Sequence, residues 1–263
     1  MDYSRFLMEV MADVEATDSR YAALKRPGLR TYPIPFFGRI DSATVLTVGT
    51  NPSSGEFEGN RWPLDADARY VSERLLGYFE AGPPAHPWFD AWRDALRWLD
   101  VSYRSGTAAH VDVSPRATIP MGQIPEIDLF LEMARTDAQW LFRLLSILER
   151  PRLVLLAGCV TKKRYIVHFL RECAPSYGFR ILGEEQHRGP GRVGYHAFES
   201  GGRQIAGFFC SVSPSGNGAA KHMLIDRITE HAARLALVIR GEHPGWTSNE
   251  RMQLTALRAA ADS

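Results

Sequence analysis

The residues best suited to chemistry follow a short apolar run near position 50. Residues 43–48, Ala-Thr-Val-Leu-Thr-Val, are rich in β-branched side chains, and Gly-Thr-Asn-Pro-Ser-Ser-Gly follows at 49–55. The run indicates a buried parallel strand, and the glycines and proline after it cannot continue that strand. Open α/β sheets bind ligands at the carboxyl ends of their strands. Asn51 is therefore the first candidate functional residue.

Three further loops follow strand-like runs in the same way. Residues 112–118, 158–163 and 213–221 each come after an apolar run and contain glycine, proline, hydroxyl or charged residues. Because the carboxyl ends of parallel strands meet at one edge of a sheet, we expect these loops to lie beside residues 50–57. Together they supply one carboxamide, one carboxylate, several hydroxyls and several cations.

The elements needed to position these loops alternate between strands and helices. A Gly-Gly pair at 201–202 separates two strand-like runs and indicates a hairpin. The alternation predicts an α/β fold with an open, mainly parallel four-stranded sheet and helices on both faces. We expect one domain over 1–240 and a flexible C-terminal extension over 241–263. Helical spacing is expected at 2–17, 66–79, 88–99, 127–148, 161–173 and 219–239.

Composition narrows the class of protein. The 263 residues are 45% hydrophobic and 23% charged, which is ordinary for a globular protein. Three widely spaced cysteines argue against a disulfide framework, a zinc ribbon or an iron–sulfur cluster, so we expect no metal and no cofactor. No run is long enough to span a membrane and no signal-peptide pattern is present, so a cytoplasmic location is expected. The net charge of +1 neither favours nor excludes nucleic acid.

In order and spacing, the four loops resemble the uracil-DNA glycosylase superfamily over about residues 40–235. Gly-Thr-Asn-Pro-Ser at 49–53 is similar to that superfamily's water-activating motif. The motif is G-Q-D-P-Y-H in the main branch, and G-I-N-P-G or G-M-N-P-G in the mismatch-specific and single-strand-selective branches. Residues 110–118 resemble the pyrimidine-recognition strand end, 155–163 the third strand and its helix, and 213–216 the closing loop. The resemblance implies that the protein is a monofunctional enzyme that removes uracil from DNA.

The resemblance assigns two catalytic residues. Asn51 would orient the attacking water through its amide oxygen, because an amide cannot remove a proton. Ser213 stands where many relatives have a histidine or asparagine that stabilises the leaving base, and its hydroxyl can donate one hydrogen bond. The backbone N–H groups of Thr50 and Asn51 are further donors to the base. The base itself would be flipped out of the DNA into a pocket.

Base recognition would involve Thr50, Ser53, Phe57 and Asp112. Phe57 would stack on the base, and the small Ser53 leaves the exclusion of 5-substituted pyrimidines open. Asp112 would accept the N3–H of uracil, where relatives usually have an asparagine. An ionised carboxylate cannot also donate to O4, as asparagine does, so Asp112 is the departure that most weakens the assignment to uracil.

The resemblance also implies contacts with the DNA backbone. Ser215, Gly216, Asn217 and Lys221 would hold phosphates, a role that helix N-termini favour. Asn217 stands where relatives often have a leucine or arginine wedge, so this loop lacks an apolar finger. We therefore expect a preference for single-stranded or loosely paired DNA, and the resemblance implies a monomer.

Alternatives remain for each of these residues. Asn51 could be a turn-former before proline, and Phe57 an ordinary core residue, with Trp62 as a rival stacking residue. Asp112 could cap the turn that follows it, with Arg116 orienting its carboxylate. The whole protein could be a non-catalytic module that binds single-stranded DNA or nucleotides, or a glycosidic hydrolase for another deaminated base or a free nucleoside.

Overall fold

Four parallel strands form the centre of the protein. The computed structural model describes residues 3–57, 62–63, 65–80, 87–162, 164–187, 191–214 and 218–242. Strand β2 (Val45–Gly49) lies between β3 (Ala108–Asp112) and β4 (Leu153–Ala157), and β9 (Arg203–Cys210) pairs with β4. Every residue of β2, β3 and β4 is buried, as expected of parallel strands covered on both faces. The four predicted strands are thus confirmed.

The sheet has seven strands, so the expectation of a four-stranded sheet is wrong. Strand β1 (Phe36–Phe37) pairs antiparallel with β3, while β8 (Arg192–Ser200) and β7 (Arg180–His187) extend the sheet beyond β9, giving the order β1-β3-β2-β4-β9-β8-β7. The predicted hairpin is confirmed, with β8 and β9 joined at the Gly-Gly pair. Strand β1 has only two residues and follows prolines, and the polar second half of β7 gives no strand signal.

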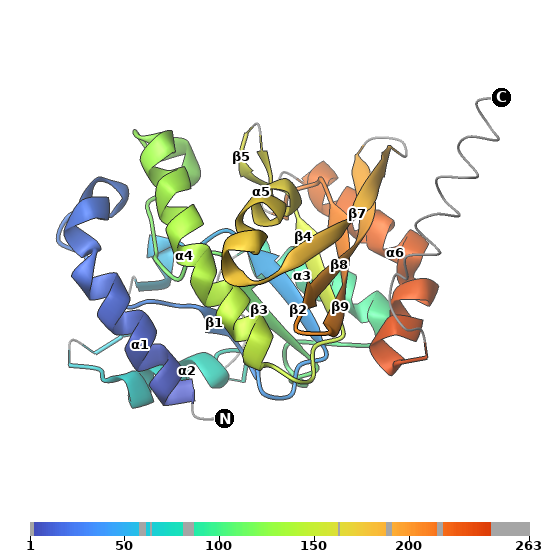
Figure 1. Cartoon of the computed structure of the whole chain (residues 1–263), viewed down its shortest axis with the longest axis horizontal. Coiled ribbons are helices and arrows are strands. Elements are labelled where there is room, and N and C mark those ends of the chain that lie inside the picture. Colours follow the sequence, from blue (N-terminus) through green and yellow to red (C-terminus); the bar gives the residue numbers. More distant parts are fainter. Residues whose placement is uncertain are drawn as a thin grey trace.

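Helices pack around the sheet. In Figure 1, α4 and α5 lie in front of the central strands and α3 lies behind them, where α6 packs against it. The α-helices are α1 (Tyr3–Ala16), α2 (Ala68–Leu76), α3 (Pro87–Leu96), α4 (Ile127–Ile147), α5 (Ile166–Cys173) and α6 (Gly218–Arg240). Short 3₁₀ helices are η1 (Asp18–Leu24), η2 (Ser54–Phe57), η3 (Arg97–Leu99), η4 (Met121–Gln123) and η5 (Ala174–Tyr177).

The predicted helices agree with these bounds except at the start of α5. The helix expected from Thr161 begins at Ile166, because β5 (Cys159–Thr161) and β6 (Arg164–Tyr165) first form a small antiparallel pair. The expected C-terminal extension, 241–263, lies almost wholly outside the described residues. Within the described part of the chain, none of the helices has the length and apolar character needed to cross a membrane.

A buried ion pair ties the loop after β3 to two helices. The Nε of Arg116 lies 2.9 Å from Oδ2 of Asp137 in α4, and the Ser114 hydroxyl donates to the same oxygen at 2.6 Å. Arg116 also donates to the Val14 carbonyl at 3.0 Å and to the Thr17 hydroxyl at 2.5 Å. Burial raises the pKa of Asp137, and the neighbouring Arg116 and Ser114 oppose that rise. The loop is therefore held to α1 and α4 by charge-assisted hydrogen bonds.

Acid should weaken the fold through His196 of β8. Its ring is fully buried beside the Arg171 guanidinium. Burial lowers the pKa of His196 from 6.5 to about 3, and the nearby Arg171 and His168 contribute to this shift. As pH falls below 6.5 the unfolded chain binds a proton that the folded chain does not, so stability present above this pH is lost. Between about pH 7 and about pH 4.5, the free energy of unfolding should fall about 2–3 kcal/mol further in the wild type than in His196→Gln. Urea denaturation measures both, and parallel pH curves would contradict the prediction.

Candidate functional site

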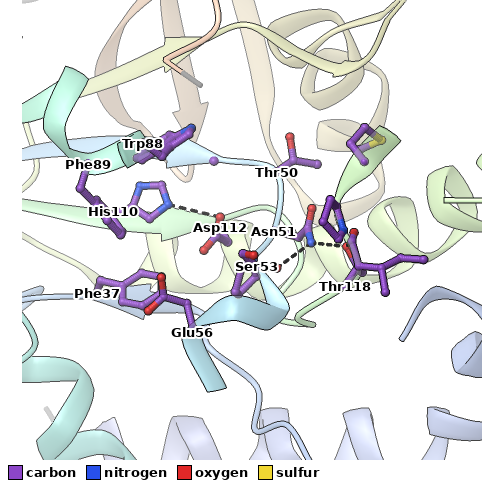
Figure 2. Close-up of a pocket in the computed structure, with 15 residues that line it drawn as sticks. Phe37, Thr50, Asn51, Ser53, Glu56, Trp88, Phe89, His110, Asp112 and Thr118 are labelled. Atoms are coloured by element: carbon purple, nitrogen blue, oxygen red, sulfur yellow. Dashed lines mark hydrogen bonds and ion pairs between the residues drawn. The ribbon is translucent and has the colours of Figure 1, made fainter. Parts of the chain in front are cut away.

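A cavity of about 350 Å³ lies at the carboxyl ends of β2 and β3 (Figure 2). Its volume is within the usual range of small-molecule sites. Its wall comes from both strand ends, from the start of α3 and from the loop before α4. The lining residues are 49–53, Glu56, His110, Asp112, 118–121 and the rings of Phe37, Trp88 and Phe89. The cavity therefore forms at the sheet edge where the sequence predicts the site.

The loops after β2 and β3 continue to pair beyond the strands. The backbone N–H groups of residues 113 and 114 donate to the carbonyls of residues 49 and 50, at 3.0 and 2.9 Å. Further on, Ser53 and Thr118 form a parallel bridge. The two loops therefore behave as one unit, and this unit places Asn51 beside the cavity.

The orientation of the Asn51 amide is fixed by its hydrogen bonds. Its Nδ2 donates to the Pro52 carbonyl at 2.9 Å and to the Thr118 hydroxyl at 2.8 Å, and that hydroxyl in turn donates to the Ile119 carbonyl. A carbonyl only accepts, so a flipped amide would lose the bond to the Pro52 carbonyl. The amide oxygen therefore points away from Thr118, as Figure 2 shows. This geometry suits an acceptor for a water molecule.

Asp112 lies over a residue without a side chain. Gly49 pairs with Asp112 across β2 and β3. A Cβ on Gly49 would lie 2.6 Å from Oδ1 of Asp112 and 2.9 Å from two atoms of the His110 ring, which is closer than real contacts. Glycine is thus required for both side chains to occupy the floor of the cavity.

A chain of hydrogen bonds runs from Asp112 into the core. His110 Nε2 lies 3.2 Å from Asp112 Oδ1, His110 Nδ1 lies 3.0 Å from the Thr47 hydroxyl, and that hydroxyl lies 2.6 Å from the Tyr103 hydroxyl. Burial raises the pKa of Tyr103 far above its usual value, so Tyr103 remains a neutral donor. We assign each group as donating to the next, from Tyr103 through Thr47 and His110 to Asp112. In this arrangement Asp112 accepts a hydrogen bond from His110.

Arg116 does not orient Asp112, so that alternative is wrong. Its guanidinium pairs with Asp137 and donates to α1, as described above. The Ser114 N–H, at the turn that Asp112 was considered to cap, bonds to the Thr50 carbonyl. The Asp112 carboxylate bonds to His110, whose Nε2 lies 3.2 Å from Oδ1.

Aromatic rings enclose His110 on the cavity side. Its ring centroid lies 4.3 Å from that of Trp88, 5.3 Å from Phe89 and 5.8 Å from the stacked Phe37. Sequence reasoning gave these four residues no role, although a Trp-Phe pair beside a predicted helix start was visible. They reach the site because β1 pairs with β3 and the start of α3 packs nearby.

Glu56 supplies a second carboxylate that sequence reasoning assigned no role. It is buried in η2 and lines the cavity, and the Tyr78 hydroxyl donates to its Oε2 at 2.6 Å. The Trp62 indole donates to the Glu56 carbonyl at 3.1 Å. Among the described residues that line the cavity there are two carboxylates and no lysine or arginine.

The structure brings four of the predicted residues together and separates others. Thr50, Asn51, Ser53 and Asp112 all line the cavity. Phe57 does not line it: the ring is buried, with its centroid 5.6 Å from that of Trp62. The alternative that Phe57 is a core residue fits this position.

The predicted closing-loop residues lie apart from the cavity where they are described. Ser213 follows β9, two strands away from β2, and packs against Gly158 at the end of β4. The Lys221 amine lies 2.7 Å from the carboxylate of Asp94 in α3, so its charge is paired within the fold. The other predicted phosphate contacts, Ser215, Gly216 and Asn217, lie outside the described residues.

Comparisons with known proteins add no family to this description. No protein-family model matches the chain, and no curated protein matches it. Across the described residues, no group of three or more His, Cys, Asp or Glu side chains is arranged to hold a metal ion.

Gly49→Ala should disrupt the floor of the cavity. The new Cβ would overlap Asp112 and His110, so we expect a loss of about 1–3 kcal/mol in the free energy of unfolding. Gly122→Ala is the control, because a Cβ there meets no atom within 4 Å, and it should change stability by less than about 0.5 kcal/mol. Urea denaturation measures both variants. Equal stability of the two would show that Gly49 is not constrained as described.

Proposed function

We propose that the protein hydrolyses the N-glycosidic bond of a base flipped out of DNA, with uracil in single-stranded DNA as the substrate. One observation supports this most strongly. Asn51 has both amide hydrogens committed to Pro52 and Thr118, and its oxygen is directed elsewhere at the edge of a base-sized cavity. A fixed acceptor beside a pocket is what a water-positioning residue requires.

The reaction needs positioning more than a strong base. Water attacks C1′ of the sugar, the C1′–N bond breaks, and its electron pair leaves with the base while a proton passes to solvent. The sugar becomes cationic before the water bond is complete, so a fixed water orientation matters more than deprotonation. Asn51 would accept a hydrogen bond from that water, and Asp112 would accept the N3–H of uracil.

The leaving base would be stabilised by the backbone of the β2 loop. Thr50 and Asn51 both line the cavity, and their N–H groups are the donors that we propose for a base oxygen. The proposal does not depend on Ser213, which lies two strands away. Trp88 replaces Phe57 as the proposed aromatic neighbour of the base, since it lines the cavity.

A second candidate function follows from the two carboxylates. The side chains of Asp112 and Glu56 are buried beside the cavity. As carboxylates they would repel the negative charge that develops on a departing base, and burial strengthens such repulsion. This favours a module that binds a base without removing it. The experiment below separates the two functions.

Replacing Asn51 with alanine should abolish excision while leaving binding intact. A single-stranded oligonucleotide with one uracil is incubated with protein, and alkali then cleaves the abasic product for analysis on a gel. Loss of the oriented water should slow excision about 100-fold or more. Gln204→Ala is the control, since this exposed amide lies on β9 away from the cavity. Unchanged excision by Asn51→Ala would refute the water-positioning role. Binding without excision by the wild type would identify a binding module.

Single-stranded substrate should react faster than a duplex. The sequence Gly-Asn-Gly at 216–218 supplies no apolar wedge to replace a flipped base in a stack. The same gel assay with the uracil strand alone and paired opposite adenine measures the two rates. An equal or faster rate on the duplex would contradict the prediction.

A further inference from the structure

The Thr118 side chain is held in one position beside Asn51 (Figure 2). Its backbone pairs with the loop after β2: the Thr118 N–H donates to the Pro52 carbonyl at 3.2 Å, and the Ser54 N–H donates to the Thr118 carbonyl at 3.0 Å. Thr118 lines the cavity and is only 3% exposed. Its hydroxyl therefore has a fixed place, which solvent cannot readily take over.

The hydroxyl of Thr118 also has a defined polarity. It donates its hydrogen to the Ile119 carbonyl at 3.0 Å, and its oxygen accepts an amide hydrogen of Asn51 at 2.8 Å. A hydroxyl has one hydrogen, so while it donates to Ile119 it can only accept from Asn51. The amide must then present its nitrogen to Thr118 and its oxygen elsewhere. Ile119 is itself fixed, because its N–H donates to the Leu24 carbonyl at 3.0 Å.

We propose that Thr118 is a positioning residue that acts through Asn51, with its hydroxyl holding the Asn51 amide oxygen toward the attacking water. The Pro52 carbonyl accepts an amide hydrogen at 2.9 Å as well, so loss of the Thr118 hydroxyl would loosen the amide without releasing it fully. A looser amide slows the chemical step, since the orientation of the water matters most in the transition state. The effect on the reaction rests on the proposed function, whereas the effect on the amide does not.

Two substitutions at Thr118 separate a role of the hydroxyl from a role of shape. Thr118→Val keeps the shape and removes the hydroxyl, whereas Thr118→Ser keeps the hydroxyl and removes a methyl group. With saturating single-stranded uracil oligonucleotide, kcat of Thr118→Val should be about five- to tenfold lower than that of the wild type, as expected for one lost hydrogen bond, and Thr118→Ser should keep at least about half of it. KM should not change in either variant. A purely structural role predicts the reverse order, with Thr118→Ser the more impaired.

Thr229→Val is the matched control. The Thr229 hydroxyl also donates to a backbone carbonyl, that of Ile225 at 2.8 Å, but α6 contributes none of the described residues that line the cavity. Its removal should leave kcat within about twofold of the wild type, since this hydroxyl touches no group of the reaction. Circular dichroism checks that each variant folds. If Thr118→Val does not fold, the Thr118→Ser variant and the wild-type amide signals described next decide.

Hydrogen exchange of the Asn51 amide tests the inference without requiring catalysis. Isotope labelling of asparagine in the full chain gives four side-chain amide pairs in an NMR spectrum, from Asn51, Asn60, Asn217 and Asn249. Asn51→Ala identifies the Asn51 pair. Both of its hydrogens are bonded, so both should exchange with solvent at least about tenfold more slowly than those of free asparagine. One of them should exchange about five- to tenfold faster in Thr118→Val, and at about the wild-type rate in Thr118→Ser.

The two measurements separate failure of this inference from failure of the proposed function. If the wild type releases no base, but Thr118→Val frees the Asn51 amide and Thr118→Ser does not, the hold of Thr118 on Asn51 is supported and the hydrolysis is contradicted. If uracil is released and Thr118→Val matches the wild type in kcat, the hydrolysis is supported and the inference is overturned. Rapid exchange of both Asn51 hydrogens in the wild type would also overturn it, as would a Thr118→Ser variant more impaired than Thr118→Val.

Discussion

The absence of a side chain at Gly49 is the constraint on which the cavity depends. Gly49 ends strand β2, and the side chains of Asp112 and His110 from the neighbouring strand β3 lie across that end. The flanking strands β3 and β4 are fully buried, so β2 cannot move aside to admit a methyl group. The close approach of two strand ends therefore determines where the carboxylate lies, and the paired loops then determine where Asn51 lies.

The buried carboxyl groups of the cavity have different partners from the buried carboxyl group that holds the loop after β3. Asp137 is paired with Arg116 on the outer side of the loop, where the pair ties the loop to α1 and α4. Asp112 and Glu56 instead line the cavity, where Asp112 bonds to His110 and Glu56 accepts a hydrogen bond from the Tyr78 hydroxyl. Burying a carboxyl group costs free energy unless hydrogen bonds compensate it, and these two bonds contribute to that compensation.

Sequence patterns predicted the framework of the site because that framework depends on local composition. The β-branched run before Gly49 and the proline after Asn51 determine where a strand ends, and Gly-Gly at 201–202 determines a hairpin. Trp88 and Phe37 could not be assigned to the cavity, since they reach it only through the packing of α3 and the pairing of β1. The pairing of Lys221 with Asp94 could not be predicted for the same reason: the two residues are adjacent only after α3 and α6 pack together.

The most direct test of the account is a crystal structure with a single-stranded oligonucleotide that contains 2′-fluoro-2′-deoxyuridine, whose glycosidic bond resists hydrolysis. The base should lie inside the cavity, with an N–H directed at Asp112. A water molecule should lie between the Asn51 amide oxygen and C1′ of the sugar. A base bound elsewhere on the protein, or an Asn51 amide turned with its nitrogen toward the sugar, would contradict it.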